Sequence, residues 1–196
     1  MARGRLSHDT RKRLLDEGVS LLIDQGYHGT GIKEVLDRVD VPKGSFYNYF
    51  ESKEHFGAEV LRHFAQGTHE RMDAWLGKPK ADALSALKAF FGEEIRRHEA
   101  ARLGCLLGNL GAELGERSEL CREAMAEGLK GMEERFSRAL ACAQEEGTVR
   151  NDIPARELAT FLLNAYEGAL LRMKIEGSVD PLRKLCSLVL DEFLRR

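Results

Sequence analysis

The sequence predicts an all-α fold made of two unequal helical parts. Leu, Ala, Glu, Lys and Arg, which favour helix, are abundant among the 196 residues, and only four prolines interrupt them. The sequence lacks the long alternation of apolar and polar residues that indicates strands. A chain of this length can bury a substantial core in one or two domains.

The first helix is predicted from about Thr10 to Gln25, where apolar residues recur at helical spacing, and Gly26 is expected to end it. Thr30 is expected to cap a second helix of about two turns. The apolar residues that define these two helices are Leu14, Leu15, Val19, Leu22 and Ile23, then Ile32, Val35, Leu36 and Val39.

A third short helix is predicted to begin at Pro42, because the missing N–H of proline costs nothing at the first position of a helix. Phe46 and Phe50 lie four residues apart and are expected to point inward together. Ser52 is expected to cap a fourth helix that continues to Trp75.

Further helices are predicted at about residues 82–99, 103–115, 118–146, 155–176 and 181–195. We therefore expect a helix-turn-helix domain at residues 1–56 and a larger helical domain at residues 57–196. The fourth helix is expected to bridge the two domains to about residue 76.

Residues 28–56 have the pattern of a helix-turn-helix, in which a tight turn places the second of two short helices in the major groove of DNA. Packing explains Ile32, Leu36, Phe46 and Phe50, but it does not explain the polar and amphipathic residues between them. DNA contact explains these better, and Gly44 would let the backbone approach DNA closely. The alternatives are that the tyrosines belong to the core and that the lysines are solvated.

The stretch VPKGSFYNYFESKEHF, within residues 30–56, resembles the DNA-binding domain of TetR-family transcriptional regulators. The resemblance is specific over residues 10–64 and architectural over the rest of the chain. It implies a homodimeric regulator, usually a repressor, whose small-molecule inducer loosens its hold on double-stranded operator DNA.

The resemblance also implies a set of DNA contacts. In the second helix, the matching phosphate contacts are Thr30 and Lys33. In the third helix, the base-edge group is Lys43, Gly44 and Ser45, and Asn48 matches a position that reaches either bases or phosphates. The remaining positions that match phosphate contacts are Tyr47, Tyr49 and Lys53. Many members of the family carry His where this chain has Tyr49.

A dimer is expected because specific operators generally contain two half-sites roughly 34–36 Å apart, and one short helix reads only a few base pairs. The apolar faces of the last two helices resemble the four-helix dimer interface of the family, although a core role would also explain them. The expected interface residues are Leu158, Phe161, Leu162, Ala165, Leu185 and Val189.

Regulation by a small molecule requires a cavity, and aromatic residues at helical spacing are candidates to line it as well as to form ordinary core. The candidates for this lining are Trp75, Phe91 and Tyr166.

The segment from Gly104 to Asn109 is similar to the branch of the family that includes the N-ethylmaleimide reductase repressor. In that branch, a Cys at the place of Cys105 senses electrophiles or oxidants, and Lys174 falls near a basic residue that pairs with it. An ammonium near a thiol favours the reactive thiolate. The alternatives are that Cys105 is a small buried hydrophobe and that the inducer is a lipophilic, non-covalent ligand.

Composition and motifs limit the other function classes. The net charge of −2 excludes a generally basic nucleic-acid coat, so DNA affinity must be local. No signal peptide or apolar run of about 18 residues is evident, which indicates a cytoplasmic protein without membrane contact. The spacing of the cysteines and histidines predicts no metal site, cofactor or enzyme centre. A ligand-binding bundle without DNA binding is the remaining alternative. One local source of positive charge for DNA affinity is the group of basic residues near the N-terminus, which are Arg3, Arg5, Arg11, Lys12 and Arg13.

Overall fold

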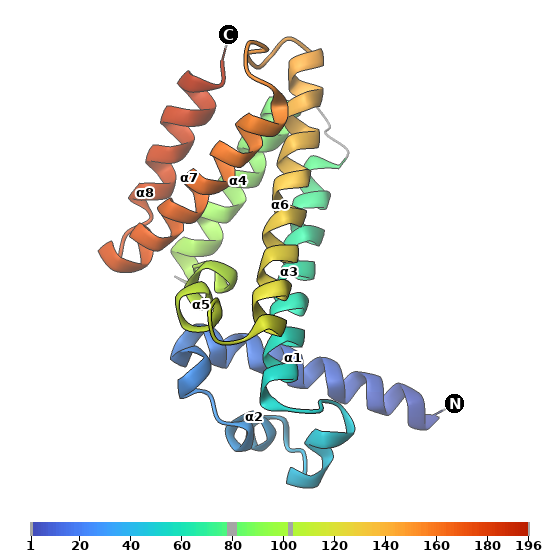
Figure 1. Ribbon diagram of the computed structural model, residues 1–196. Helices are drawn as coiled ribbons and strands as arrows, with labels where there is room; N and C mark the ends of the chain where they lie inside the picture. The colour runs from blue at the N-terminus through green and yellow to red at the C-terminus, as the bar shows by residue number, and fades with distance from the viewer. Residues whose placement is uncertain (1, 78–81, 102–103, 196) are drawn as a thin grey trace. The chain divides into compact units, whose positions relative to one another are not determined.

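The computed structural model describes residues 2–77, 82–101 and 104–195, and for residues 2–8 it describes the backbone alone. These residues form helices joined by short connections, and the described ranges contain no β-strand (Figure 1). The predicted all-α fold is confirmed. In chain order, the elements are the α-helices α1 (Ala2–Gly29) and α2 (Ile32–Val39), the 3₁₀ helix η1 (Lys43–Asn48), the α-helices α3 (Lys53–Leu76), α4 (Ala83–Ala100), α5 (Leu106–Leu114), α6 (Glu119–Glu145), α7 (Ala155–Glu176) and α8 (Asp180–Leu185), and the π-helix η2 (Cys186–Phe193).

The chain divides into two compact units. The first unit comprises the residues up to 66 together with 106–128, and the second unit comprises 67–105 together with 129–196. This division differs from the predicted one at residue 56, because α5 and the first part of α6 group with the N-terminal helices. Helices α3 and α6 contribute residues to both units.

The core of the first unit depends on a close approach between α1 and α3. A Cβ at Gly18 in α1 would stand 2.7 Å from the Phe56 ring and 2.7 Å from a methyl group of Val60. Any larger residue would therefore push α3 away. The buried apolar residues of this unit include Leu14, Leu15, Leu21, Leu22, Val35, Leu36, Val39, Phe46, Phe50, Phe56, Val60 and Leu61.

Helix α1 and its connection to α2 differ from the prediction. The helix begins at Ala2 and is interrupted, as expected, at Gly26, where φ is 72° and ψ is 179°. The prediction that Thr30 caps α2 is wrong, because Gly31 occupies the N-cap position and no side chain caps the helix. The buried Thr30 hydroxyl instead donates to the Gly26 carbonyl over 2.7 Å.

The segment that follows α2 is close to the prediction. The third helix is present as the 3₁₀ helix η1, and Pro42 precedes it as the N-cap rather than being its first residue. Ser52 caps α3 as predicted, since the His55 N–H donates to the Ser52 Oγ over 3.0 Å. The buried positions of Phe46 and Phe50 confirm that both rings point inward.

The second unit is built around aromatic residues of α4, α6 and α7. Phe91 stacks on Phe136 with ring centroids 5.7 Å apart, and it meets Tyr166 edge-on at 5.3 Å. Other buried residues of this unit include Leu84, Leu87, Phe90, Met132, Leu140, Leu158, Leu162, Leu170, Met173, Leu182 and Leu190.

None of the helices in the described ranges combines the length and the apolar character needed to span a membrane.

Candidate functional site

The η1 helix presents polar and amphipathic side chains to solvent. Lys43, Gly44, Tyr47 and Asn48 are exposed, and Tyr47 is exposed to 67% although it is a large aromatic residue. Beyond the Cα of Gly44 there is open space where a Cβ would stand. Ser45 is half-buried, as is Tyr49, which lies against Phe50 with ring centroids 6.4 Å apart. Tyr47 is therefore not a core residue.

A cluster of phenylalanines holds η1 in place. The Phe46 ring lies 5.3 Å from that of Phe50 and 5.6 Å from that of Phe56 on α3, and the Phe50 and Phe56 rings are 4.9 Å apart. Six residues of 3₁₀ helix would not be stable alone. These edge-to-face and tilted contacts supply the missing stability, so the polar residues of η1 are free to serve another purpose.

The two residues near α2 that were predicted to contact phosphates differ in how far their side chains are exposed to solvent. The Lys33 side chain is 70% exposed, and its ammonium lies 4.0 Å from the Asp37 carboxylate, a distance at which an exposed ion pair contributes little. Thr30 is only 2% exposed and its hydroxyl is already bonded to Gly26. The structure therefore keeps Lys33 on the candidate surface and removes the Thr30 side chain from it.

Lys53 occupies the first turn of α3, where the helix dipole disfavours a cation. Its ammonium lies over the Tyr27 ring, 4.7 Å from the ring centroid, and this cation–π contact offsets part of that cost. Burial lowers the pKa of Lys53, and the negative charge of Glu113 acts in the opposite direction. Sequence reasoning missed Tyr27 and Glu113 because neither is close to Lys53 along the chain.

The basic residues near the start of α1 have partners within the first unit. Arg11 pairs with Glu59, Lys12 pairs with Asp16 at 2.7 Å, and Arg13 donates to the Val39 carbonyl at the end of α2 over 2.8 Å. The side chains of Arg3 and Arg5 lie outside the described ones.

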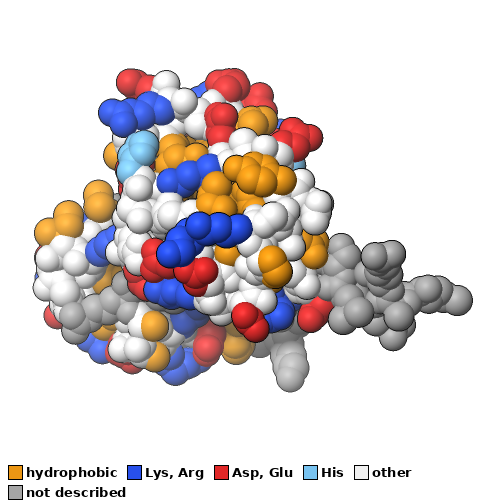
Figure 2. All heavy atoms as spheres, turned by 90° about the horizontal axis from the view of Figure 1, so that it is seen from below, with side chains coloured by type: hydrophobic (Ala, Val, Ile, Leu, Met, Phe, Trp, Pro, Cys, Tyr) orange, Lys and Arg blue, Asp and Glu red, His pale blue; other side chains and the backbone are white. Residues whose placement is uncertain are grey.

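Lys and Arg side chains lie among Asp and Glu side chains on the face of the molecule that Figure 2 shows. The basic character of the candidate surface is therefore local, as the net charge of −2 requires.

The second unit contains a buried polar cluster centred on Glu94 of α4. The Tyr166 hydroxyl donates to the Glu94 carboxylate over 2.7 Å, and guanidinium nitrogens of Arg71 and Arg97 lie 3.7 and 3.6 Å from it. His98 lies 3.8 Å from the same carboxylate. Burial raises the pKa of Tyr166 well above its usual value and lowers the pKa of His98. Both side chains are therefore neutral near pH 7.

Cys105 adjoins this cluster. It is 6% exposed, and its thiol is hydrogen-bonded to the carboxyl group of Glu167 on α7. Burial raises the pKa of Glu167 to about 7, against the opposing effect of that hydrogen bond. The described partner of Cys105 is thus a carboxyl group, whereas the sequence suggested Lys174, which is exposed.

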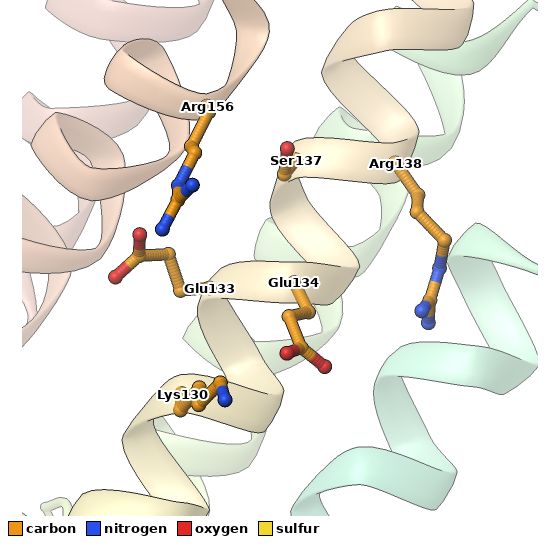
Figure 3. A pocket seen from close by; sticks show the side chains of 6 residues that line it. All are labelled: Lys130, Glu133, Glu134, Ser137, Arg138 and Arg156. Carbon is orange, nitrogen blue, oxygen red and sulfur yellow. The ribbon is translucent and has the colours of Figure 1, made fainter.

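The residues predicted to line a ligand cavity separate into two groups. Phe91 and Tyr166 are buried in contact with each other, but Trp75 is 39% exposed. The second unit has an open hollow of about 520 Å³ on α6, toward which Arg156 extends from α7 (Figure 3). Its lining is charged and polar, so it is not the apolar cavity that was expected. The lining residues are Lys130, Glu133, Glu134, Ser137, Arg138 and Arg156.

Most of the predicted dimer-interface residues are buried inside a single chain. Leu158 is 1% exposed and Leu162 is not exposed, so neither has area left to bury against a second chain. Leu185 and Val189 are 7% and 6% exposed, and Ala165 is half-buried. These four buried residues are corrected to core positions.

Helix α7 has a second stripe, which faces solvent. Phe161, Leu171 and Ile175 are exposed to 46, 55 and 74%, and Leu188 on η2 is exposed to 66%. The ring of Phe193 on η2 lies 5.2 Å from that of Phe161, so η2 flanks the stripe. Only Phe161 of this stripe was predicted. A second set of apolar residues at 3–4 spacing would have revealed the others.

Two family models match this chain. The model described as bacterial regulatory proteins, tetR family, matches residues 14–60, and the model described as tetracyclin repressor-like, C-terminal domain, matches residues 82–189.

Similar proteins cover almost the whole chain. The HTH-type transcriptional repressor NemR of Escherichia coli strain K12 is 35% identical over 89% of this chain and 89% of its own length. The repressor DhaR of Mycobacterium sp. strain GP1 is 32% identical over 94% of this chain and 92% of its own length. The solved structure of reduced E. coli NemR, at 31% identity, has a TM-score of 0.89 and covers 96% of this chain and 98% of that one.

Proposed function

The chain belongs to the TetR family of bacterial regulatory proteins, and on that premise we propose that it is a homodimeric repressor. It binds double-stranded operator DNA through its first unit, in the cytoplasm. A chemical signal received in its second unit releases it from the operator. The repressors DhaR and NemR, which this chain resembles over nearly all of its length, support repression rather than activation.

The observation that carries the proposal is the exposed surface of η1. A small helix that is anchored by three buried phenylalanines but presents Lys43, Gly44, Tyr47 and Asn48 to solvent is suited to an external polar partner. Base edges in the major groove offer hydrogen-bond groups to Lys43 and Asn48, and the phosphates offer charge to Lys53 and Lys33. In this proposal, Ser45 and Tyr49 lie at the margin of the contact.

The proposal is tested by measuring the DNA affinity of Lys43→Ala and Lys53→Ala as a function of salt. We expect each variant to lower the salt slope by about one, because each removes one cation from the interface. Lys53→Ala should weaken operator and random duplexes alike, whereas Lys43→Ala should also reduce the preference for the operator, by about 1–3 kcal/mol.

Lys184→Ala, which removes an exposed lysine from the second unit, is the matched control and should leave binding unchanged. Operator binding that is unchanged in both test variants would overturn the proposed interface.

The exposed stripe of α7 supports the dimer. Phe161, Asn164, Gly168, Leu171 and Ile175 follow one another at intervals of three and four residues, and all are exposed. This is the spacing of a helix–helix seam, and nothing lies within 4 Å of where a Cβ of Gly168 would stand. A second stripe in addition to the core stripe is more than a single chain needs. We therefore assign it to the partner subunit.

The signal site is proposed at the cluster that joins Cys105, Tyr166 and Glu167. An α,β-unsaturated carbonyl compound would react there by addition: the sulfur of Cys105 forms a bond to the β-carbon, and the thiol proton ends on the α-carbon. The alternative is an inducer that binds beside Phe91 without reacting.

Cys105→Ser distinguishes the two modes when operator release by N-ethylmaleimide is measured. We expect Cys105→Ser to stay bound, and Cys142→Ser, which removes an exposed thiol, to be released like the wild type. Normal release of Cys105→Ser would refute the covalent mode.

A further inference from the structure

Helix α1 contains a break whose backbone is held by a residue from a distant part of the sequence. Gly26 has φ 72°, in the left-handed region, and the N–H groups that follow such a break lack helical acceptors. The Glu113 carboxylate of α5 accepts both of the next N–H groups, from Tyr27 over 3.0 Å and from His28 over 3.3 Å. A Cβ at position 26 would come within 2.5 Å of a Glu113 oxygen. Glycine is therefore required by the backbone and by the carboxylate.

The residue whose N–H is held in this way also supports Lys53. The Tyr27 ring lies under the Lys53 ammonium, 4.7 Å from it at the centroid. The same ring also packs against α3 one turn further on, since a Cβ at Gly57 would stand 2.8 Å from one of its carbons. Glu113 also attracts the Lys53 charge. Tyr27 is thus fixed through its backbone by Glu113 and through its ring by α3.

The segment that carries Glu113 makes a second contact with the same turn of α3. The Ser118 hydroxyl donates to the carboxylate of Glu54, the neighbour of Lys53, over 2.6 Å, and it accepts the Cys121 N–H at the start of α6. Helix α5 lies alongside α1 in the first unit (Figure 1). Within the first unit, α5 and the connection to α6 therefore contact both the break in α1 and Glu54, the neighbour of Lys53 on α3.

From these contacts we infer that Glu113 is a positioning residue for the DNA contact of Lys53. The inference rests on the proposed function, in which Lys53 binds a phosphate. With Glu113 in place, the 26–28 backbone and the Tyr27 ring are fixed, and the Lys53 ammonium is presented at one position. A displacement of α5 that withdraws the Glu113 carboxylate frees that turn and costs the protein a phosphate contact. Cys105 directly precedes the first residue of α5, so the cysteine of the proposed signal site lies eight residues before the positioning residue Glu113.

The experiment measures operator affinity against salt for Glu113→Ala, Lys53→Ala and the double variant. We expect Glu113→Ala to weaken operator binding on the order of tenfold, as for loss of one charge-assisted contact, and to lower the salt slope by about one. In the Lys53→Ala background, the same substitution should have little further effect, because the contact that it positions is already missing. Glu113→Gln, which keeps one acceptor oxygen, should retain part of the affinity.

A control and a stability measurement keep the inference falsifiable. Glu116→Ala removes an exposed carboxylate from the turn after α5 and should bind DNA like the wild type. All binding is measured below the thermal midpoint of each variant, so that partial unfolding does not contribute. A salt slope unchanged in Glu113→Ala would show that this residue only stabilises the fold.

Losses in affinity that simply add in the double variant would also overturn the inference. If Lys53→Ala itself bound DNA normally, the proposed interface would fail rather than the role of Glu113 alone.

Discussion

The candidate DNA surface of the first unit and the exposed α7 stripe of the second unit present different kinds of side chain. In the first unit, aromatic residues are buried beneath η1 and polar residues such as Lys43 and Asn48 face solvent. In the second unit, the exposed residues of α7 include the large apolar Leu171 and Ile175, whereas Glu94 is buried. The first pattern suits a polar, charged partner, and the second suits another apolar helix surface.

The two units also differ in how completely their buried polar groups are hydrogen-bonded. The first unit buries few polar side chains, and Thr30 is one whose hydroxyl is satisfied by a backbone carbonyl. The cluster around Glu94 and Tyr166 is less complete, because the Nε of Arg71 and the Nδ1 of His98 lack hydrogen-bond partners within the described part of the chain. An incompletely satisfied network is more easily shifted by a ligand or a change of charge.

The largest effect is expected from a charge in the exposed α7 stripe. Ile175→Asp should convert the dimer to a folded monomer, because it places a carboxylate in the apolar interface at the most exposed large apolar residue of the stripe. Operator affinity should fall on the order of a hundredfold or more, since the two half-sites are no longer bound together. Sedimentation gives the mass, and binding to whole operators and to half-sites gives the loss of affinity.

The matched control for this variant is Leu120→Asp, which makes a similar change at a leucine of the first unit that is 41% exposed. This control should remain a dimer. If Ile175→Asp also stayed dimeric at micromolar concentration, the stripe would not be the interface, and the comparison between the two units would lose its main support.

A smaller effect is expected from the buried carboxyl group of Glu167, whose pKa is raised by burial from 4.5 to about 7. A raised folded-state pKa contributes stability that is present below about pH 4.5 and is lost as the pH rises through about 7. Glu167→Gln should remove that pH dependence. Relative to the variant, the wild type should lose on the order of 2–3 kcal/mol of unfolding free energy between pH 4.5 and pH 8.

Urea denaturation at several pH values measures this difference. Glu176→Gln is the control, because Glu176 is an exposed carboxylate on the same helix that pairs with Arg172. Its pH dependence should match that of the wild type. Parallel pH profiles of Glu167→Gln and the wild type would mean that Glu167 is solvated.

The sequence correctly predicted that the polar residues of η1 face solvent, because the helix is too small to bury them. Lys43 and Tyr47 had no core to join, and they are exposed in the structure. On α7, the same reasoning chose Leu158 and Leu162, because helical periodicity identifies an apolar stripe without saying what covers it. With two apolar stripes on one helix, only the fold distinguishes core from interface.

The contacts that depend on distant segments could not be predicted. Glu113 and Tyr27 are 86 residues apart, and their hydrogen bond requires α5 to pack on α1. Glu167 likewise reaches Cys105 only because α7 returns past the connection before α5. Local patterns predicted the helices and most of their ends, whereas these side-chain partners follow from tertiary packing.

The smallest effect is expected at Thr30, which separates a structural role from the phosphate contact that the sequence suggested. Thr30→Val keeps the shape of the side chain but removes the hydrogen bond to the Gly26 carbonyl, so unfolding should become easier by about 1 kcal/mol. Thr30→Ser should restore most of that stability. Because the side chain is 2% exposed, both variants should bind DNA with the salt slope of the wild type when they are folded. A Thr30→Val protein of normal stability whose salt slope fell would instead return Thr30 to the DNA interface, and it would mean that the first unit rearranges when it binds.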